Sequence, residues 1–448
     1  MKLHKLKIWS ALSMTVEYLK KPIKQEIYED STTTEIVKKI LSDIELGGEE
    51  KLIEYSKKLD GFAGPFVVTP EQIQRASEQV PEQMKKDIFF AHRNIKTFAE
   101  AQLKSMQEFE LEIDSGLFAG QRLIPIDTAG CYIPGGRYSH IASAIMSITT
   151  AKVAGVENVI ACSPPDSNGN INPAILYTMK LCGADTILAL GGVQGIAAMA
   201  YGIGLEKPAN FLAGPGNRFV AEAKRLLFGK VGIDVFAGPS EIAVIADETA
   251  DPDLVIGDLI GQAEHGLDSP AWLITTDSAL AQYVIDHMYE KIAELPELQR
   301  EAAKASWTNF GEVILCSDRE AAATISDEYA AEHLEVHAKD DKFWLKRLKN
   351  YGSLFLGEET TVAFADKCSG TNHILPTKGA AKYTGGLSVG KFLKVVTYQR
   401  MDKQSMENVA SVTARISRLE GMEAHARTGD QRLKKYFPEK SFETGYPQ

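Results

Sequence analysis

Several features that mark common classes of protein are missing from this sequence. The five cysteines form no CxxC pair and, being odd in number, no complete disulfide framework, which indicates a compartment where thiols stay reduced. No apolar run reaches the ~18 residues of a membrane-spanning helix. Lysines also interrupt the opening segment MKLHKLKIWSALSM, where a signal peptide needs an unbroken apolar core. These absences predict a cytoplasmic protein.

Positive charge is also scarce. The 448 residues contain 49 Lys and Arg against 60 Asp and Glu, which gives a formal net charge of −11. Nucleic acids and membrane surfaces are polyanionic and would be repelled by most of such a surface. We therefore expect no nucleic acid and no membrane as partner, but a small-molecule substrate. An anionic substrate would need a locally basic site.

The hydrophobic pattern changes along the chain, which is longer than one core usually organises. Residues 32–107 repeat the apolar spacing of helices. From residue 121 onwards, short apolar runs such as NVIACS and TILALGG alternate with helical segments, which is typical of parallel α/β sheets. Helix returns at 401–428, and residues 429–448 are expected to form an irregular tail.

This order predicts an α/β fold with two Rossmann-like but incomplete domains, a helical N-terminal lead-in and a C-terminal helical dimerisation segment. A seam between two sheets is expected near residue 238. The terminal helix lacks a full apolar face and is expected to pack on a partner subunit. The expected divisions are an N-terminal tail (1–23), a discontinuous α/β catalytic domain (24–130 and 239–390), an α/β cofactor-binding domain (131–238) and the C-terminal segment (391–448).

Two glycine-rich turns follow predicted strands, LALGGVQGIAAMAYG (188–202) and FLAGPGNRFVAEAKRLL (211–227). Backbone NH groups at a helix start can cradle a phosphate. Neither turn has the G-x-G-x-x-G pattern followed by an acidic residue, and both are equally compatible with ordinary tight turns. A third turn, CYIPGGRYSH, places Tyr132, Arg137 and His140 beside flexible backbone.

Histidines beside oxygen-bearing side chains are the candidates for metal binding. In a helix, Gln262 and His265 of QAEHG share a face, so an amide oxygen and an imidazole could converge on one cation. A surface helix also shows such pairs by chance. Zinc accepts imidazole nitrogen together with carboxylate or amide oxygen. Further candidate ligands are Asp366 and His373 in DKCSGTNHILPT and Glu420 and His425 in LEGMEAH, although His425 could equally be solvated surface.

The segment EHLEVH (332–337) carries the other dense cluster of titratable groups. Glu332 and His333 cannot share a helix face, but in a turn or at a helix start both could project into a cleft, one as a base and one as its partner. The alternative is the start of an ordinary amphipathic helix.

These motifs, taken in order, resemble the histidinol dehydrogenase family over about residues 20–430. They are CYIPGG, ALGGVQGIAA, GPGN, AGPSE, QAEHG, EHLE, D-x3-G-T-N-H-x-L-P-T and LEGMEAH. The resemblance implies an NAD- and zinc-dependent enzyme that oxidises a primary alcohol through an enzyme-held aldehyde to a carboxylate.

The resemblance also implies roles for individual residues. Glu332 and His333 would be catalytic: His333 takes the alcohol proton, and Glu332 activates the water that hydrates the aldehyde. Zn²⁺ would be bound by Gln262, His265, Asp366 and His425, with His425 supplied by the other subunit of a homodimer that exchanges its C-terminal segment. Cofactor-binding positions would be Tyr132, Gln194 and Asn217, and substrate-side positions would be Ser240, His373 and Glu420.

Some segments differ from the pattern of the histidine-biosynthesis enzymes, and these differences indicate which substrate to expect. GRYSHIASA, EHLEVH and GEETTVAF more closely resemble the sulfopropanediol 3-dehydrogenase branch, which converts (R)-2,3-dihydroxypropane-1-sulfonate to (R)-3-sulfolactate. A sulfonate favours a guanidinium or several NH donors, so Arg137 and His140 are candidate substrate-binding residues, whereas both would disfavour the cationic histidinol. Arg137 could instead face the NAD pyrophosphate or solvent, and Glu420 suits an ammonium substrate.

Two alternatives to this substrate and activity stay open. The first is L-histidinol dehydrogenase, which uses the same site to make L-histidine. The second, from another class, is a zinc-dependent hydrolase or an inactive binding protein on this scaffold. Formation of NADH with an alcohol separates this last alternative from both dehydrogenases.

Overall fold

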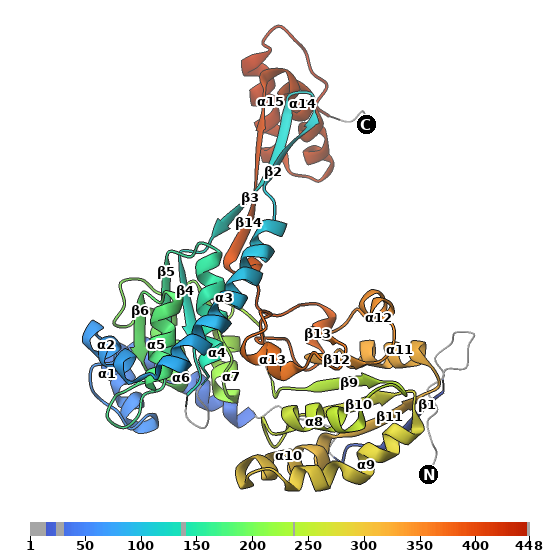
Figure 1. Ribbon diagram of the computed structural model, residues 1–448. Coiled ribbons are helices and arrows are strands. Elements are labelled where there is room, and N and C mark those ends of the chain that lie inside the picture. Colours follow the sequence, from blue (N-terminus) through green and yellow to red (C-terminus); the bar gives the residue numbers. More distant parts are fainter. Residues whose placement is uncertain (1–14, 24–30, 136–139, 236–237, 446–448) are drawn as a thin grey trace. The chain divides into compact units, whose positions relative to one another are not determined.

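The computed structural model describes residues 15–23, 31–135, 140–235 and 238–445. Two compact units divide the chain. Unit 1 comprises Met1–Leu103 and Ile126–Phe392, and unit 2 comprises Lys104–Pro125 and Leu393–Gln448. The α/β class predicted from the sequence is confirmed (Figure 1).

Three helices form the N-terminal part of unit 1: α1 (Ser31–Leu59), α2 (Pro70–Gln79) and α3 (Glu82–Ser105). Their helical character was predicted, but not their packing. Helix α1 contacts α6 and α7, and α2 contacts α5, so they lie against the first sheet of the unit, not against the second as the expected 24–130/239–390 domain requires. The cause is the apolar face of α1, whose Val37, Ile44 and Leu52 are buried with Leu188 and Leu212 of that sheet.

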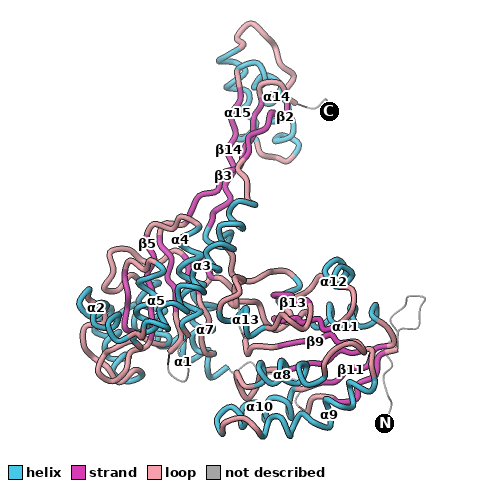
Figure 2. The backbone as a smooth tube through the Cα atoms, viewed as in Figure 1, coloured by secondary structure: helices cyan, strands magenta, loops and turns pink. Residues whose placement is uncertain are grey.

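The first sheet of unit 1 is parallel, with the strand order β6-β5-β4-β7-β8. Figure 2 shows β5 of this sheet beside helix α4. The chain leaves β4 in one direction for β5 and β6 and then returns to the other side for β7, so β4 and β7 flank a topological switch point, where α/β sheets bind ligands. The strands are β4 (Thr128–Tyr132), β5 (Asn158–Ser163), β6 (Thr186–Ala189), β7 (Phe211–Ala213) and β8 (Gly232–Ile233), with α4 (Ile141–Val153), α5 (Pro173–Cys182), α6 (Gly192–Tyr201) and α7 (Arg218–Leu227) between them.

The second sheet follows the predicted seam and has the order β1-β11-β10-β9-β12-β13. All its pairs are parallel except that of β1 (Val16–Lys20), which lies antiparallel on the edge, so residues 16–20 of the expected N-terminal tail belong to a sheet. The other strands are β9 (Ile242–Ala246), β10 (Ala271–Thr275), β11 (Glu312–Cys316), β12 (His333–His337) and β13 (Ser353–Leu356).

Helices and short turns connect the strands of the second sheet. Helix α8 follows β9, and α13 follows β13; these two helices carry most of the predicted metal ligands of unit 1. The elements are α8 (Pro252–Ala263), α9 (Ser278–Ala293), α10 (Glu297–Phe310), α11 (Arg319–Tyr329), α12 (Asp341–Arg347), α13 (Val362–Lys367) and the 3-10 turns η1 (Ala380–Lys382) and η2 (Val389–Phe392).

Unit 2 joins two distant parts of the chain. Its antiparallel sheet has the order β14-β3-β2, formed by β2 (Phe109–Asp114), β3 (Leu117–Pro125) and β14 (Leu393–Met401), and the helices α14 (Lys403–Leu419) and α15 (Glu423–Tyr436) pack on each other. The sequence predicted the helices but not the sheet, and it placed 429–436 in an irregular tail where α15 continues. Its core is small, with Met406, Ala410 and Leu433 buried.

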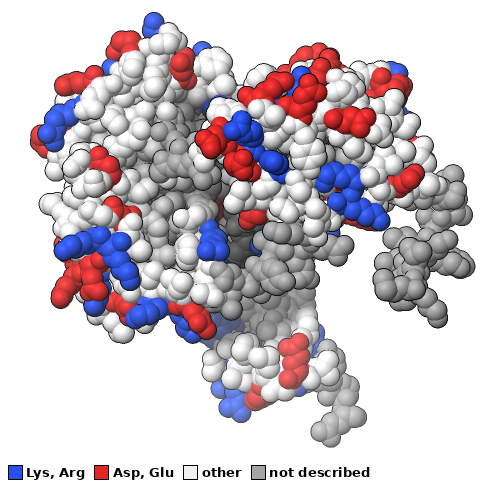
Figure 3. Space-filling view, turned by 90° about the horizontal axis from the view of Figure 1, so that it is seen from below, with Lys and Arg blue, Asp and Glu red and all other residues white. Residues whose placement is uncertain are grey.

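Charge is mixed over the surface. On the face in Figure 3, acidic and basic side chains gather in small neighbouring groups of both signs. Among the helices of the described residues, none combines the length and the apolar character needed to cross a membrane.

Candidate active site

The predicted catalytic couple lies where two neighbouring strands of the second sheet begin. EHLEVH forms a strand, neither the turn nor the helix start expected, and His333 opens β12 opposite Ile242 of β9. The backbone NH of Glu241 donates to Glu332 Oε2 (3.0 Å), and His333 Nδ1 lies 3.1 Å from the Glu241 carbonyl oxygen. Glu332 and His333 are both buried. The segment before β9 therefore fixes both side chains.

Three of the four predicted metal ligands lie on or just after the two helices that flank these strands: Gln262 on α8, His265 in the turn that follows it, and Asp366 on α13. Gln262 Nε2 is 3.2 Å from His265 Nδ1 at the end of α8, which returns antiparallel to β9. Asp366 projects from α13, with Oδ1 3.7 Å from Nε2 of His333. The structure thus brings Asp366 beside His333, and Gln262 beside His265.

The donor set of unit 1 fits a zinc ion. Among the described residues, buried Gln262 Oε1 and His333 Nε2 have no hydrogen-bond partner, and a buried amide oxygen without a partner costs about 1–3 kcal/mol. A cation bound by Gln262 Oε1, the His265 imidazole and the Asp366 carboxylate removes this cost. Amide oxygen, imidazole nitrogen and carboxylate oxygen are donors that zinc accepts.

Burial sets the protonation of the site. Desolvation by the surrounding protein lowers the pKa of His265 to about 4, although the residue as a whole is solvent-exposed, and burial also lowers the pKa of His333. Both imidazoles are therefore neutral at pH 7, the form that binds a metal or accepts a proton. Burial has the opposite effect on Glu332, whose pKa is raised well above its ordinary value.

His373 is held at both ring nitrogens. Nδ1 lies 3.1 Å from the carbonyl oxygen of Asp366, and Nε2 lies 2.9 Å from Ser143 Oγ on α4. His140, at the start of α4, is within electrostatic reach: burial, followed by the His373 charge, lowers its pKa to about 4. His140 therefore lies near His373, whereas Arg137 lies outside the described residues.

Sequence reasoning missed Glu241, Ser143 and Lys378. Burial raises the pKa of Glu241 to about 7, against the backbone and charge of Lys378. Lys378 has a positive φ of 55°, and its side chain passes over Gly238. Glu241 stands in the AGPSE motif beside the predicted Ser240, so a signal for it existed. Ser143 lies in the apolar helix α4, where no sequence pattern marks it as part of a site.

The predicted cofactor residues lie near the switch point of the first sheet. Tyr132 ends β4, and its hydroxyl accepts a hydrogen bond from the Gly192 NH (3.0 Å). Asp60 Oδ2 accepts from the Gly191 NH (3.0 Å) and from Gln194 Nε2 (2.8 Å). The Asp60 carboxylate thus already accepts a hydrogen bond from the backbone NH that could otherwise bind an anion at the start of α6.

The turn after β7 is different. Asn217 is exposed, and its side-chain oxygen accepts from the NH groups of Phe219 and Val220 at the start of α7. Below this turn, Lys224 Nζ donates to the Gly214 carbonyl (2.8 Å) and pairs with Asp234. The exposed turn between β7 and α7 is therefore supported from the core.

We expect Lys224→Met to be strongly destabilising. Lys224 and Asp234 are buried, and removal of one partner leaves the other as an uncompensated buried charge, so the free energy of unfolding should fall by about 3–5 kcal/mol. Exposed Lys230, which pairs with Glu45, is the matched control, and its Met variant should lose less than about 1 kcal/mol. Urea denaturation measures both; equal midpoints for the two variants would contradict this role.

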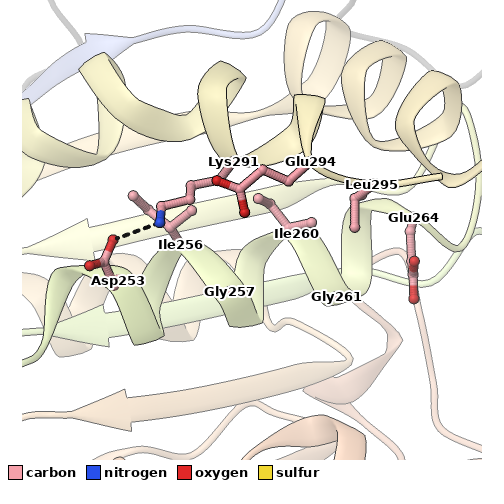
Figure 4. Close-up of a pocket in the computed structure, with 9 residues that line it drawn as sticks. All are labelled: Asp253, Ile256, Gly257, Ile260, Gly261, Glu264, Lys291, Glu294 and Leu295. Carbon is pink, nitrogen blue, oxygen red and sulfur yellow. Dashed lines mark ion pairs between the residues drawn. The ribbon is translucent and has the colours of Figure 1, made fainter. Parts of the chain in front are cut away.

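A surface pocket beside the site does not belong to it. Asp253, Ile256 and Ile260 of α8 line the pocket together with Lys291 of α9, which lies 3.7 Å from Asp253 (Figure 4). With 3.6 residues per turn, these positions face away from Gln262 on the helix. The pocket is therefore on the opposite side of α8 from the candidate metal ligands.

Two predicted residues lie in unit 2. Glu420 ends α14 and His425 lies in the first turn of α15; both are exposed. Within the described residues, the Asp, Glu and His side chains that come together as a group able to hold a metal are a different set, Asp258, Glu335 and His337.

Comparison with known proteins agrees with this geometry. The sequence profile described as histidinol dehydrogenase matches residues 23–433. A histidinol dehydrogenase homolog of Pelagibacter ubique is 59% identical, covering 94% of this chain and 99% of that protein. Sulfopropanediol 3-dehydrogenase of Ruegeria pomeroyi is 56% identical, covering 96% and 99%.

A solved structure supports the same assignment. The crystal structure of histidinol dehydrogenase from Elizabethkingia anophelis superposes with a TM-score of 0.87 at 33% identity, covering 92% of this chain and 95% of that one. The match extends over nearly the whole fold, including both sheets. The chain therefore belongs to the histidinol dehydrogenase family, a family of oxidoreductases.

Proposed function

We propose that the chain is an NAD- and zinc-dependent dehydrogenase that oxidises (R)-2,3-dihydroxypropane-1-sulfonate through the aldehyde to (R)-3-sulfolactate. The observation that carries the proposal is the site itself, with Asp366 beside the buried Glu332–His333 couple and the unpartnered Gln262 oxygen next to His265. The similarity to a relative named sulfopropanediol 3-dehydrogenase supports the choice of substrate.

Gln262, His265, Asp366 and, from a second subunit, His425 would hold the zinc. When bound, zinc supplies a Lewis acid that favours loss of the proton from the substrate hydroxyl. His265 is a solvent-exposed residue, which leaves this side of the site open to a substrate. Exposure of His425 is compatible with its donation to another chain.

The first oxidation needs a base at the hydroxyl. Neutral His333 would accept the hydroxyl proton, and NAD, when bound, would supply the hydride acceptor for the oxidation to the aldehyde. In the second oxidation, Glu332 would act in its ionised form and accept a proton from the water whose oxygen bonds to the aldehyde carbon. A second NAD would be the hydride acceptor when the hydrate is oxidised to the carboxylate. One alcohol and one water thus reduce two NAD and release three protons.

The cofactor is proposed to bind at the switch point between β4 and β7. Asn217 stands exposed at this edge, Tyr132 ends β4, and Gln194 lies in the first turn of α6. The amide oxygen Gln194 Oε1 is buried without a hydrogen-bond partner among the described residues, so it remains available to a donor on the cofactor.

Local positive charge supports an anionic substrate. Lys378 is exposed beside Glu241, and it comes from the same loop as His373. A charge-assisted hydrogen bond contributes about 1.5–3 kcal/mol. We propose that Lys378 and His140, with Arg137 from the segment after β4 in the sequence, receive the sulfonate, while Ser240, His373 and Glu420 complete the substrate side.

Lys378→Met should therefore raise KM for the sulfonate about 10- to 100-fold, the factor that corresponds to one charged hydrogen bond. Lys382, four residues later and also exposed, is the matched control, and its Met variant should keep the KM of the wild type. Steady-state kinetics at saturating NAD measure both. The same KM in the two variants would remove Lys378 from the site.

A homodimer that exchanges its C-terminal segment is part of the proposal. Unit 2 exposes apolar side chains on β2, where Phe109, Leu111 and Ile113 occupy alternate positions of one strand face. Further exposed apolar residues lie on its helices, including Ile416 and Leu419. Such surface is typical of contact with another subunit. We propose that this dimer acts in the cytoplasm.

The substrate is tested by two alcohols. Purified protein with zinc and NAD should show a higher kcat/KM for the sulfonated diol than for L-histidinol, measured by NADH absorbance. L-Histidinol is the second candidate, because other close relatives are described as histidinol dehydrogenase homologs. A higher kcat/KM for L-histidinol would refute the substrate but keep the chemistry, and no NADH with either alcohol would refute both.

A further inference from the structure

Strand β12 buries a row of ionisable side chains beyond the candidate active site. His333, Glu335 and His337 occupy alternate positions and share one face of the strand. Leu334 and Val336 point to the other face, into an apolar core. All five residues are buried, and Glu335 and His337 have no part in the chemistry above.

Asp258 of α8 completes a cluster at the far end of this row. Asp258 precedes Gln262 by one helical turn, so both project from the same face of α8 towards β12. His337 Nε2 lies 3.3 Å from Asp258 Oδ2 and 3.5 Å from Glu335 Oε2. The three groups offer ligand atoms that all lie within 4.8 Å of one another.

The distances from the His337 imidazole to the two carboxylates suit a shared metal ion better than direct hydrogen bonds. N–H···O bonds are usually about 2.7–3.2 Å long, and neither carboxylate comes that close to the His337 imidazole. Two ligand atoms at ~2.0–2.2 Å from a tetrahedral zinc are roughly 3.4 Å apart. The measured 3.3 and 3.5 Å agree with this spacing.

The other hydrogen bonds of Glu335 and Asp258 leave the carboxylate oxygens that face His337 available to a ligand. Glu335 Oε1 accepts from the Val362 NH (2.6 Å), and Asp258 Oδ1 accepts from Thr361 Oγ1 (2.8 Å). Among the residues with described positions, Glu335 Oε2 and both ring nitrogens of His337 have no hydrogen-bond partner. The protein thus holds the outer oxygen of each carboxylate and directs the other towards the imidazole, as outer contacts of metal ligands do.

Charge balance favours a divalent cation. Two carboxylates meet in a site where Glu335 and His337 are fully covered, and a buried charge is costly unless it is compensated. A proton on Nε2 of His337 can bond only one of the two carboxylates. A divalent cation compensates both.

We propose that Asp258, Glu335 and His337 form a second divalent-cation site, separate from Gln262, His265 and Asp366. The imidazole together with two carboxylates favours zinc or a similar transition metal over magnesium or calcium. The Asp258 side chain is 18% exposed, which provides an entry path and room for a water ligand.

The role of this second ion is structural. It links α8, β12 and, through Thr361 and Val362, the start of α13. These three elements carry Gln262, His333 and Asp366. The ion thereby fixes the framework of the active site without touching the substrate.

Zinc stoichiometry tests the proposal. Wild-type protein loaded with zinc and then dialysed should contain two zinc ions per chain by mass spectrometry of the metal, and Asp258→Asn should contain one. The amide oxygen introduced by this change can still accept from Thr361, so the fold is preserved. Asp253→Asn, an exposed acid on the same helix, is the matched control and should contain two.

A second variant separates this site from the proposed function. His265→Ala should also contain one zinc, and the double variant with Asp258→Asn should contain none. If His265→Ala loses a zinc ion and Asp258→Asn does not, the second site is wrong and the first is kept. If Asp258→Asn loses a zinc ion and His265→Ala does not, only the first site is wrong. If Asp258→Asn does not fold, zinc-edge anomalous scattering from wild-type crystals decides, since the proposal requires a peak among the three side chains.

Discussion

Replacing His265 by alanine is expected to abolish zinc binding at the active site and to lower kcat/KM by about 10³-fold or more. Metal polarisation of a substrate oxygen contributes several kcal/mol of transition-state stabilisation, and each 1.36 kcal/mol corresponds to a tenfold rate. His265 is the only imidazole that the end of α8 contributes to this donor set in the described part of the chain. Added zinc should not restore the activity of the variant.

The control for this prediction is His287→Ala. His287 lies on α9, where it stacks on Tyr283 and bonds the carbonyl of that residue, away from the site. This variant should keep the zinc content and kcat/KM of the wild type. If His265→Ala retained full activity after treatment with a chelator, the proposed metal site would be wrong.

Replacing Glu332 by glutamine is expected to separate the two oxidations. The glutamine oxygen still accepts from the Glu241 NH, so the local geometry is kept, but the amide cannot take a proton from water. Loss of a general base typically costs about 10²–10⁴-fold in rate. The yield of NADH per alcohol should fall from two towards one, and an aldehyde trap such as hydroxylamine should capture the intermediate.

Glu328→Gln, an exposed change on α11, is the matched control and should still produce two NADH per alcohol. Two NADH at the wild-type rate from Glu332→Gln would show that another group activates the water. Buried Glu241, whose backbone bonds Glu332, would be the next residue to test.

The sequence identified the parallel α/β pattern because buried strands such as NVIACS are short apolar runs between helices. Strand β12 could not be recognised from this pattern. Its sequence HLEVH alternates apolar and polar residues, yet the polar face is buried as well, because Asp258, Asp366 and the start of α13 cover it. A surface strand or helix start is the ordinary expectation for that composition.

The pairing of strands that are far apart in the sequence could not be predicted either. The sheet of unit 2 joins β3 to β14, for example Gly120 to Tyr398, and neither strand carries a local signal of its partner. Helix α15 continues through QRLKKY, a segment that was expected to belong to an irregular tail. In the site, Lys378 reaches Glu241 from a distant loop, so only coordinates reveal it.

Zinc-edge anomalous scattering from crystals of the zinc-loaded protein would locate the metal of the active site. We expect a peak at about 2.0–2.2 Å from oxygen atoms of Gln262 and Asp366 and from a ring nitrogen of His265, next to His333. A zinc-loaded crystal without a peak at that point would contradict the proposed metal site.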